Sequence, residues 1–251
     1  MALPVLDRDM DLSFYDRENQ HSKLAVPQHT SPHFRKDFSG NDILSEKSGG
    51  NNPVTMASVA IIFMGLPGST KSTQARALAE YLDAEWINRD EKGSAMGFAT
   101  AVVNSKSHTV VLDQCHHTMK SRVETINLLS DGCRIVWVVM KHPDDSAAMT
   151  KNAQELCLSR IYTRKGHRTL KAEDASKTMK IFAKKWVPLT PNEFPNAQII
   201  TVDMRAPAHK ILTTILEKLK VDVDPARVAE TLFNSRDFEA RLVKPAVVKT
   251  D

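Results

Sequence analysis

The stretch that most constrains the fold is residues 60–73, where the apolar run Ala-Ile-Ile-Phe-Met passes through Gly-Leu-Pro-Gly-Ser-Thr into Lys-Ser-Thr. The run before Gly65 is short and rich in branched residues, which is typical of a buried strand, and apolar residues then recur at helical spacing from Ala75 to Leu82. A strand that turns directly into a helix presents free backbone N–H groups, and the positive end of the helix dipole, to whatever lies in the turn. The sequence therefore predicts a phosphate-binding loop.

The loop follows the pattern G-x-x-x-x-G-K-[ST] with one departure. Lys71 is expected to reach the β and γ phosphates of a nucleotide, and the Ser72 hydroxyl to ligate Mg²⁺. Thr70 occupies the position of the second glycine, and a β-branched residue is costly there if the backbone needs a positive φ. The predicted nucleotide-binding residues run from the first glycine into the helix: Gly65, Gly68, Ser69, Thr70, Lys71, Ser72 and Thr73.

Composition and cysteine spacing favour a chain that works in a reducing compartment. The longest apolar run, around residues 60–64, is far shorter than the ~20 residues of a membrane span, so no membrane partner is expected. The N-terminus has no basic start followed by an apolar core, and therefore no visible secretory signal. The three cysteines form no C-x-x-C pair. We therefore expect a cytoplasmic or nuclear location.

Three regions differ in their patterning. Residues 1–55 are rich in polar residues, proline and glycine without a sustained period, which predicts a mostly disordered leader or linker. Residues 56–222 alternate strands with helices and are expected to form a P-loop kinase domain. Residues 223–251 are expected to be a C-terminal helix and a tail. The fold class predicted is α/β, a P-loop NTPase-type parallel sheet with helices on both faces and an arginine-bearing helical lid.

The hydrophobic patterns place the individual elements. Continuous apolar runs predict strands over 58–64, 85–88, 108–113, 134–140 and 198–203. Helical spacing predicts helices over 72–83, 120–130, 146–161, 172–185, 208–219 and 224–242, with a helix or loop through 97–104.

Charge is unevenly distributed. Residues 1–55 hold six Lys/Arg against eight Asp/Glu, which leaves a net charge of +6 for the remainder of a chain whose net charge is +4. Between Arg160 and Lys185, nine Lys/Arg face only Glu173 and Asp174. Such an excess suits phosphates or a nucleic-acid strand, although the lysines alone are equally consistent with a solvated helix face.

Two carboxylates follow predicted strands closely enough to reach the carboxyl edge of the sheet, where ligands bind in this fold class. Asp90 is a candidate general base, which would accept the proton of an attacking hydroxyl and orient it toward the γ phosphate. Asp113 is a candidate for holding magnesium through water or for binding the acceptor. The alternative for both is helix N-capping.

A third element is the run Arg-Lys-Gly-His-Arg at 164–168. Arg164 and Arg168 flank Gly166 and are candidates for neutralising charge on the transferring phosphoryl group, with Arg160 as a third. Each arginine taken alone is equally consistent with an ordinary surface position.

Taken in order, these motifs resemble a known family. Gly-Leu-Pro-Gly-Ser-Thr-Lys-Ser-Thr, then Ile-Asn-Arg-Asp, then Val-Val-Leu-Asp-Gln-Cys-His-His, then the 164–168 run, are similar to the polynucleotide 5′-hydroxyl kinases, and most similar to the kinase module of fungal-type tRNA ligases. The resemblance covers roughly residues 57–205. It implies that Lys71 and Ser72 bind nucleotide phosphates and magnesium, that Asp90 is the general base, and that Arg164 or Arg168 is the lid arginine.

One further position departs from the family pattern. Phage-type relatives carry an arginine three residues after the base, and this chain has Gly93 there. The acceptor must therefore be contacted by other residues. The predicted acceptor-binding set is Arg89, Asp113 and His117. His116 and His117 lack a third ligand at metal spacing, so a zinc site is not expected.

The leading hypothesis is a magnesium-dependent kinase that transfers the γ phosphate of ATP or GTP to the 5′-hydroxyl of RNA, in tRNA splicing or RNA repair. RNA with a 5′-hydroxyl end and an RNA ligase domain or subunit are the expected partners. Two alternatives stay open: a P-loop kinase for a small nucleoside-like molecule, and a degenerate nucleotide-binding scaffold for an RNA ligase, which Thr70 and Gly93 favour.

Overall fold

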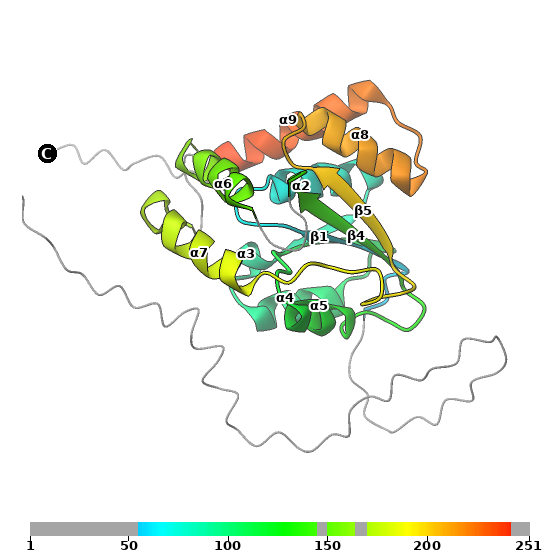
Figure 1. Cartoon of the computed structure of the whole chain (residues 1–251). Coiled ribbons are helices and arrows are strands. Elements are labelled where there is room, and N and C mark those ends of the chain that lie inside the picture. The colour runs from blue at the N-terminus through cyan, green and yellow to red at the C-terminus, as the bar shows by residue number, and fades with distance from the viewer. Residues whose placement is uncertain (1–54, 145–149, 164–169, 242–251) are drawn as a thin grey trace, which may run out of the picture. The chain divides into compact units, whose positions relative to one another are not determined.

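The computed structural model describes residues 55–144, 150–163 and 170–241. Its centre is a sheet of five parallel strands in the order β2-β3-β1-β4-β5 (Figure 1). The strands are β1 (Val59–Met64), β2 (Glu85–Asn88), β3 (Thr109–Asp113), β4 (Arg134–Lys141) and β5 (Gln198–Asp203). The five predicted strands are confirmed, each within one residue at either end, and the three central strands are apolar runs that the sheet buries on both faces.

β1 occupies the middle of the sheet, with β3 on one side and β4 on the other. The chain builds the β2–β3 side first and then crosses to β4 and β5. The strand order therefore reverses at β1, and the loop that leaves the carboxyl end of β1 lies where ligands bind in open α/β sheets.

The helices of the described residues agree with the predicted pattern, with local differences. They are α2 (Lys71–Leu82), α3 (Arg89–Lys92), α4 (Ala95–Asn104), α5 (Met119–Ile126), α6 (Lys151–Thr163), α7 (Ala175–Lys185), α8 (Ala208–Leu219) and α9 (Pro225–Arg241), and a 3-10 turn, η2 (Ala172–Asp174), precedes α7. The region for which either helix or loop was predicted is the helix α4, which begins where the Ser94 hydroxyl accepts a hydrogen bond from the Gly97 N–H.

The predicted helix 120–130 is too long at its C-terminal end, because α5 stops at Ile126. The N–H groups of Leu128 and Leu129 bond back to carbonyls three residues earlier, which tightens the last turn. The Leu128 carbonyl then accepts a hydrogen bond of 3.0 Å from the Thr55 N–H, and Leu129 turns into the core. A contact with a residue more than seventy positions away ends the helix.

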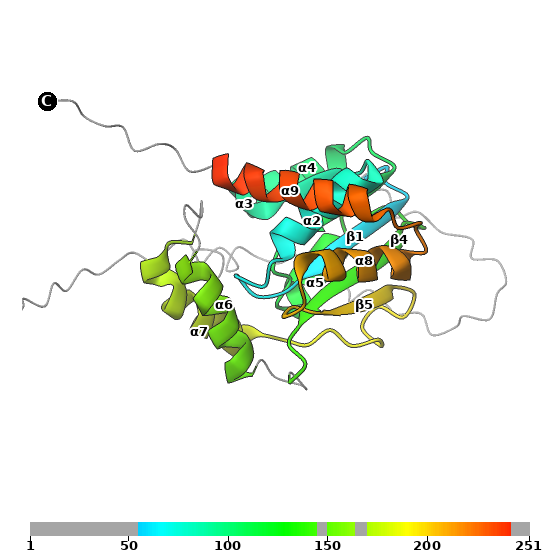
Figure 2. The same cartoon turned by 90° about the horizontal axis from the view of Figure 1, so that it is seen from above.

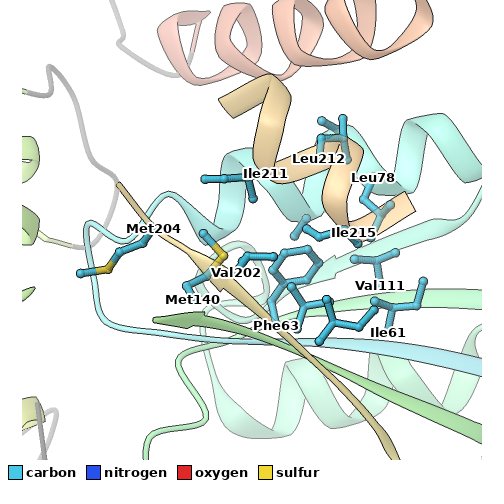
Figure 3. Close-up of a cluster of buried hydrophobic side chains, with 14 of the residues drawn as sticks. Ile61, Phe63, Leu78, Val111, Met140, Val202, Met204, Ile211, Leu212 and Ile215 are labelled. Atoms are coloured by element: carbon cyan, nitrogen blue, oxygen red, sulfur yellow. The ribbon is translucent and has the colours of Figure 1, made fainter. Parts of the chain in front are cut away.

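Helices cover both faces of the sheet, as predicted. On one face, side chains of β1, β3, β4 and β5 pack against α2 and α8, and Figure 3 shows Phe63 and Val202 among Leu78, Ile211 and Ile215. On the other face, the alternate strand residues form a second cluster with α4 and the turn after α5. Figure 2 shows α8 and α9 running over the sheet, with α6 and α7 beyond one end of it. The α/β fold class is confirmed.

The C-terminal helix α9 packs on α2, the helix that follows the phosphate-binding loop. Val228 and Leu232 of α9 join the apolar core. The Tyr81 hydroxyl of α2 donates to the Asp222 carbonyl at 2.9 Å, and the Ser235 hydroxyl donates to the Thr73 carbonyl at 2.9 Å. The division of the chain at residue 222 stays a prediction, and the predicted leader, 1–55, lies outside the described residues except for its last position.

Candidate active site

The loop between β1 and α2 contains two residues with positive φ. Gly68 has φ +83° and Thr70 has φ +69° with ψ 8°, so both lie in the left-handed region. The sequence predicts a strained backbone if position 70 needs a positive φ, and the structure shows that it does. This conformation costs an L-residue such as Thr70 about 1–2 kcal/mol. Thr70 is the N-cap of α2 and makes no side-chain cap bond, so the helix starts at Lys71 with its first N–H groups free of helical partners.

The loop is packed closely against its surroundings. A Cβ on Gly68 would lie 2.4 Å from the Cys157 carbonyl oxygen of α6, and a Cβ on Gly65 would lie 2.9 Å from the Met140 Cβ of β4. Both positions therefore require glycine. This close approach fixes α6, which carries Arg160, against the loop.

Several buried polar atoms around the loop have no hydrogen-bond partner within the described part of the chain. They are Ser69 Oγ, Thr70 Oγ1, Gln74 Oε1 and Asp113 Oδ1. Buried polar groups are ordinarily paired, since an unpaired one costs about 1–3 kcal/mol. The concentration of such atoms in the loop and the end of the adjacent strand fits a site that binds a polar ligand.

Lys71 is partly exposed in this site and faces acidic groups. Burial alone would lower the pKa of Lys71, but Cys115, Asp113 and Asp90 together outweigh it and raise that pKa. Lys71 is therefore positively charged at neutral pH. A cation held at the start of a helix, between carboxylates and free N–H groups, is placed to bind phosphate oxygens.

Asp113 is the last residue of β3 and is 1% exposed. Burial raises the pKa of its carboxyl, while Lys71 and hydrogen bonds from Ser72 and Asn88 act in the opposite direction. Asp113 caps no helix, because Thr118 is the N-cap of α5. A carboxylate beside the loop serine, with one oxygen unpartnered, is the donor set that Mg²⁺ uses together with phosphate oxygens and water.

Asn88 connects Asp113 to the short helix that carries Asp90, and sequence reasoning missed it. Parallel pairing of β2 and β3 places Asn88 opposite Asp113, and its amide donates to the Asp113 Oδ2 atom. The Asn88 Oδ1 atom accepts a hydrogen bond of 2.9 Å from the Glu91 N–H and so caps α3. Asn88 is the residue before Arg89-Asp90, and a polar residue at the end of a predicted strand is the signal that could have found it.

Asp90 is exposed, lies in the first turn of α3 and acts electrostatically on Lys71 and Asp113. The capping alternative does not hold for Asp90, because Asn88 is the cap. The structure therefore brings Asp90, Asp113, Lys71 and Ser72 together at the carboxyl edge of the sheet. A hydroxyl approaching a phosphate on the loop would meet an ionisable, solvent-accessible carboxylate there.

Cys115 and His116 follow β3, and neither was predicted to take part in the site. Cys115 is partly exposed, burial raises the pKa of its thiol, and the thiol contacts Lys71. Burial lowers the pKa of His116 to about 4, so its ring is neutral. The ring Nδ1 donates to the Phe63 carbonyl at 2.9 Å, and Nε2 lies 3.0 Å from the Thr125 hydroxyl. His116 therefore anchors the loop that follows Asp113.

A buried ion pair secures the same loop. The Arg122 guanidinium, which is fully buried, makes two bonds of 2.7 Å with the Glu193 carboxylate. Its third nitrogen donates to the carbonyls of His116 at 3.1 Å and Val187 at 2.9 Å. Arg122 thus ties the loop after β3 to the segment that follows α7.

The remaining predicted site residues have different positions. His117 packs on Phe182 of α7, with ring centroids 4.3 Å apart. Arg89 is partly buried in α3. Arg160 donates to the Met204 carbonyl at 2.8 Å. Arg164 and Arg168 lie outside the described residues.

Comparison with known proteins shows the fold. No family model matches the chain, and no curated protein does. Among solved structures, a fungal RNA kinase matches with a TM-score of 0.60 at 15% sequence identity, over 76% of this chain and 100% of the other. A sugar kinase from Janibacter sp. HTCC2649 matches with a TM-score of 0.47 at 16% identity (68% and 98% covered), and a gluconokinase from Sinorhizobium meliloti 1021 with 0.42 at 16% (72% and 98%).

The protein has the fold of a P-loop kinase. The resemblance drawn from the motifs is confirmed at the level of the fold, because the fungal RNA kinase matches along its whole length. Within the described ranges, none of the helices combines the length and apolarity needed to cross a membrane. Nor do His, Cys, Asp and Glu side chains gather in threes at metal-binding distance there.

Proposed function

We propose that this protein is a magnesium-dependent kinase that transfers the γ phosphate of ATP or GTP to the 5′-hydroxyl end of RNA. The observation that carries the proposal is the meeting of Lys71, Ser72, Asp113 and Asp90 at the carboxyl edge of the sheet, beside the loop between β1 and α2. A nucleotide-binding scaffold has no need of the exposed carboxylate of Asp90.

The loop and the first turn of α2 bind the donor. Backbone N–H groups of the first turn of α2, from Lys71 to Thr73, and the Lys71 ammonium hold the β and γ phosphates, and preorganised charge of this kind supplies most of the catalysis in phosphoryl transfer. The Ser72 hydroxyl and the Asp113 carboxylate would hold the magnesium ion. The ion, when bound, neutralises charge on the phosphate oxygens.

Asp90 acts on the acceptor. Its carboxylate accepts the proton of the attacking hydroxyl and orients that oxygen in line with the γ phosphate. Its position depends on Asn88, which caps α3 and is held by Asp113, so the base and the magnesium ligand are aligned by one side chain. Arg164 and Arg168 are proposed to neutralise charge on the transferring phosphoryl group.

RNA is the proposed acceptor because of the motif order, the basic residues from 160 to 185 and the similarity in fold to a fungal RNA kinase. We place the reaction in tRNA splicing or RNA repair, in the cytoplasm or nucleus, with an RNA ligase domain or subunit as the partner that uses the new 5′ phosphate. Arg89, Asp113 and His117 are the proposed contacts to the 5′-terminal nucleotide, and His117 lies against Phe182 of α7.

The test is transfer of labelled γ phosphate from ATP, and separately from GTP, to a 5′-hydroxyl RNA oligonucleotide. The same RNA carrying a 5′ phosphate is the matched control acceptor, and a nucleoside represents the small-molecule alternative. Label on the 5′-hydroxyl RNA alone supports the proposal and identifies the donor. Label on the nucleoside alone would favour a small-molecule kinase, and nucleotide binding without transfer would favour a scaffold.

A further inference from the structure

Helix α7 carries a stripe of lysines on its outer face. Lys177, Lys180 and Lys184 are spaced i, i+3 and i+7, so they lie on one side of the helix, and all three are exposed. The opposite side buries Ala175 and Met179 in the core. We refer to these three lysines as the α7 stripe.

Two lysines on other helices have acidic partners, whereas the stripe lysines, like Lys210 and Lys218 of α8, make no ion pair within the described residues. Lys120 of α5 faces Glu124 at 3.8 Å, and Lys151 of α6 faces Glu155 at 3.5 Å, each as an i,i+4 ion pair. The stripe lysines follow one another at i+3 and i+4, where like charges repel.

Helix stability does not account for the stripe either. Lys177 lies in the first turn of α7, where the helix dipole disfavours a cation. Glu173 and Asp174 precede the helix, and Glu173 already pairs with Lys171 at 3.6 Å. The stripe lysines are held close together despite their mutual repulsion, and Lys177 is held in the first turn despite the helix dipole. Positive charge kept under these two unfavourable conditions points to an anionic ligand.

Helix α7 lies beside the candidate active site and carries the stripe on the side opposite Phe182. Phe182, between Lys180 and Lys184, packs on His117, and the Val187 N–H just after α7 donates to the His117 carbonyl at 2.8 Å. His117 is four residues beyond Asp113. α7 is therefore fastened to the loop that leaves the carboxyl end of β3, on the side toward which the strand arrows point in Figure 1.

We propose that the α7 stripe binds the phosphate backbone of the RNA acceptor downstream of its 5′ end. This inference rests on the proposed function and adds the surface that distinguishes a polynucleotide from a small acceptor. Seven residues of helix span about 10 Å, which lets three ammonium groups contact successive phosphates of one strand. Contacts of this kind are insensitive to base sequence and sensitive to salt.

The first experiment measures binding of a fluorescent 5′-hydroxyl RNA 12-mer by anisotropy as a function of salt. The variant is the triple change K177Q/K180Q/K184Q, and the matched control is K106Q/K218Q/K220Q. The control removes the same charge from exposed lysines at the amino edge of the sheet, where the Lys218 carbonyl accepts from Gln198, the first residue of β5.

Loss of three phosphate contacts predicts that the slope of log K against log salt decreases by about 2, with affinity at 50 mM salt reduced about tenfold or more. The control triple variant should match the wild type. Equal slopes in the α7 variant and the wild type would overturn the inference, as would a failure of the wild type to bind RNA.

The second experiment separates this inference from the proposed function. Phosphoryl transfer is measured on a 5′-hydroxyl dinucleotide, which is too short to reach along the stripe, and on the 12-mer. The α7 variant should keep wild-type kcat/KM on the dinucleotide and lose about tenfold or more on the 12-mer through KM. An equal loss of kcat/KM on both acceptors would overturn the inference that the α7 stripe binds RNA. If neither the wild type nor the variants transfer phosphate, the proposed kinase function is rejected. RNA binding that depends on the α7 stripe would then still identify an RNA-binding surface.

Discussion

Replacing Thr70 with glycine should stabilise the protein, although it removes a side chain from the middle of the phosphate-binding loop. Thr70 has φ +69°, which costs an L-residue about 1–2 kcal/mol, and its hydroxyl is buried without a partner among the described residues. Thr70→Gly relieves both. It loses about 0.8 kcal/mol for the methyl group and about 0.4–1 kcal/mol to the greater freedom of glycine in the unfolded chain. We expect a net gain of about 1 kcal/mol.

The sharper comparison is between Thr70→Gly and Thr70→Ala, because both remove the hydroxyl and the methyl group and only glycine relieves the backbone. At Thr70, glycine should be more stable than alanine by about 1 kcal/mol. Thr100, exposed in the middle of α4, provides the matched control. There the order should be reversed, with glycine about 1 kcal/mol less stable than alanine, because the backbone is helical.

The assay is urea unfolding at 25 °C for the four variants and the wild type. The free energies of unfolding are compared only if all five proteins show the same slope against urea concentration. An alanine variant at position 70 as stable as the glycine variant would refute the reasoning, because the backbone there would then be unstrained. The same order of glycine and alanine at both positions would refute it too.

Three further predictions use the same assay. Stability should fall by about 2 kcal/mol between pH 7 and pH 5, because His116 keeps a pKa of about 4 when folded and regains its ordinary value when unfolded, and His116→Asn should flatten that dependence. Arg122→Met should cost about 3–5 kcal/mol by leaving the Glu193 carboxylate buried and unpaired, and the double variant Arg122→Met/Glu193→Met should recover most of the loss. Gly68→Ala should cost about 1–3 kcal/mol more than Gly132→Ala, because both glycines have positive φ and only the Cβ at Gly68 meets backbone.

The sign of the pH effect follows from protonation. Unfolded His116 binds a proton below about pH 6.5, whereas the folded ring does so only below about 4. Protonation therefore favours the unfolded state as pH falls through this window, and the stability contributed by the neutral ring is present above it. The same pH dependence of stability in the wild type and in His116→Asn between pH 7 and pH 5 would contradict this account of the ring.

The centre of the sheet could be predicted from the sequence because β1, β3 and β4 are buried on both faces and therefore read as apolar runs. The conformation of Thr70 could be predicted as well, since the loop pattern demands glycine at that position. In both cases the signal is local, and the residues that carry it are neighbours in the chain.

What could not be predicted depends on pairs distant in sequence. The role of Asn88 requires the register that sets it opposite Asp113, and the end of α5 requires the contact between Thr55 and Leu128. The contact between His117 and Phe182 likewise joins two residues far apart in the chain. None of these partners is identified by spacing or composition.

The central claim, that Asp90 is the base of an RNA 5′-hydroxyl kinase, is tested most directly by single-turnover transfer of labelled γ phosphate to a 5′-hydroxyl RNA in the wild type and in Asp90→Asn. Asparagine keeps the shape of the side chain and cannot accept the proton at neutral pH. We predict transfer by the wild type, and a rate lower by about 10²–10⁴ in the variant with nucleotide affinity unchanged. A variant that transfers at the wild-type rate would contradict the role of Asp90, and a wild type that binds nucleotide and transfers nothing to RNA would contradict the function.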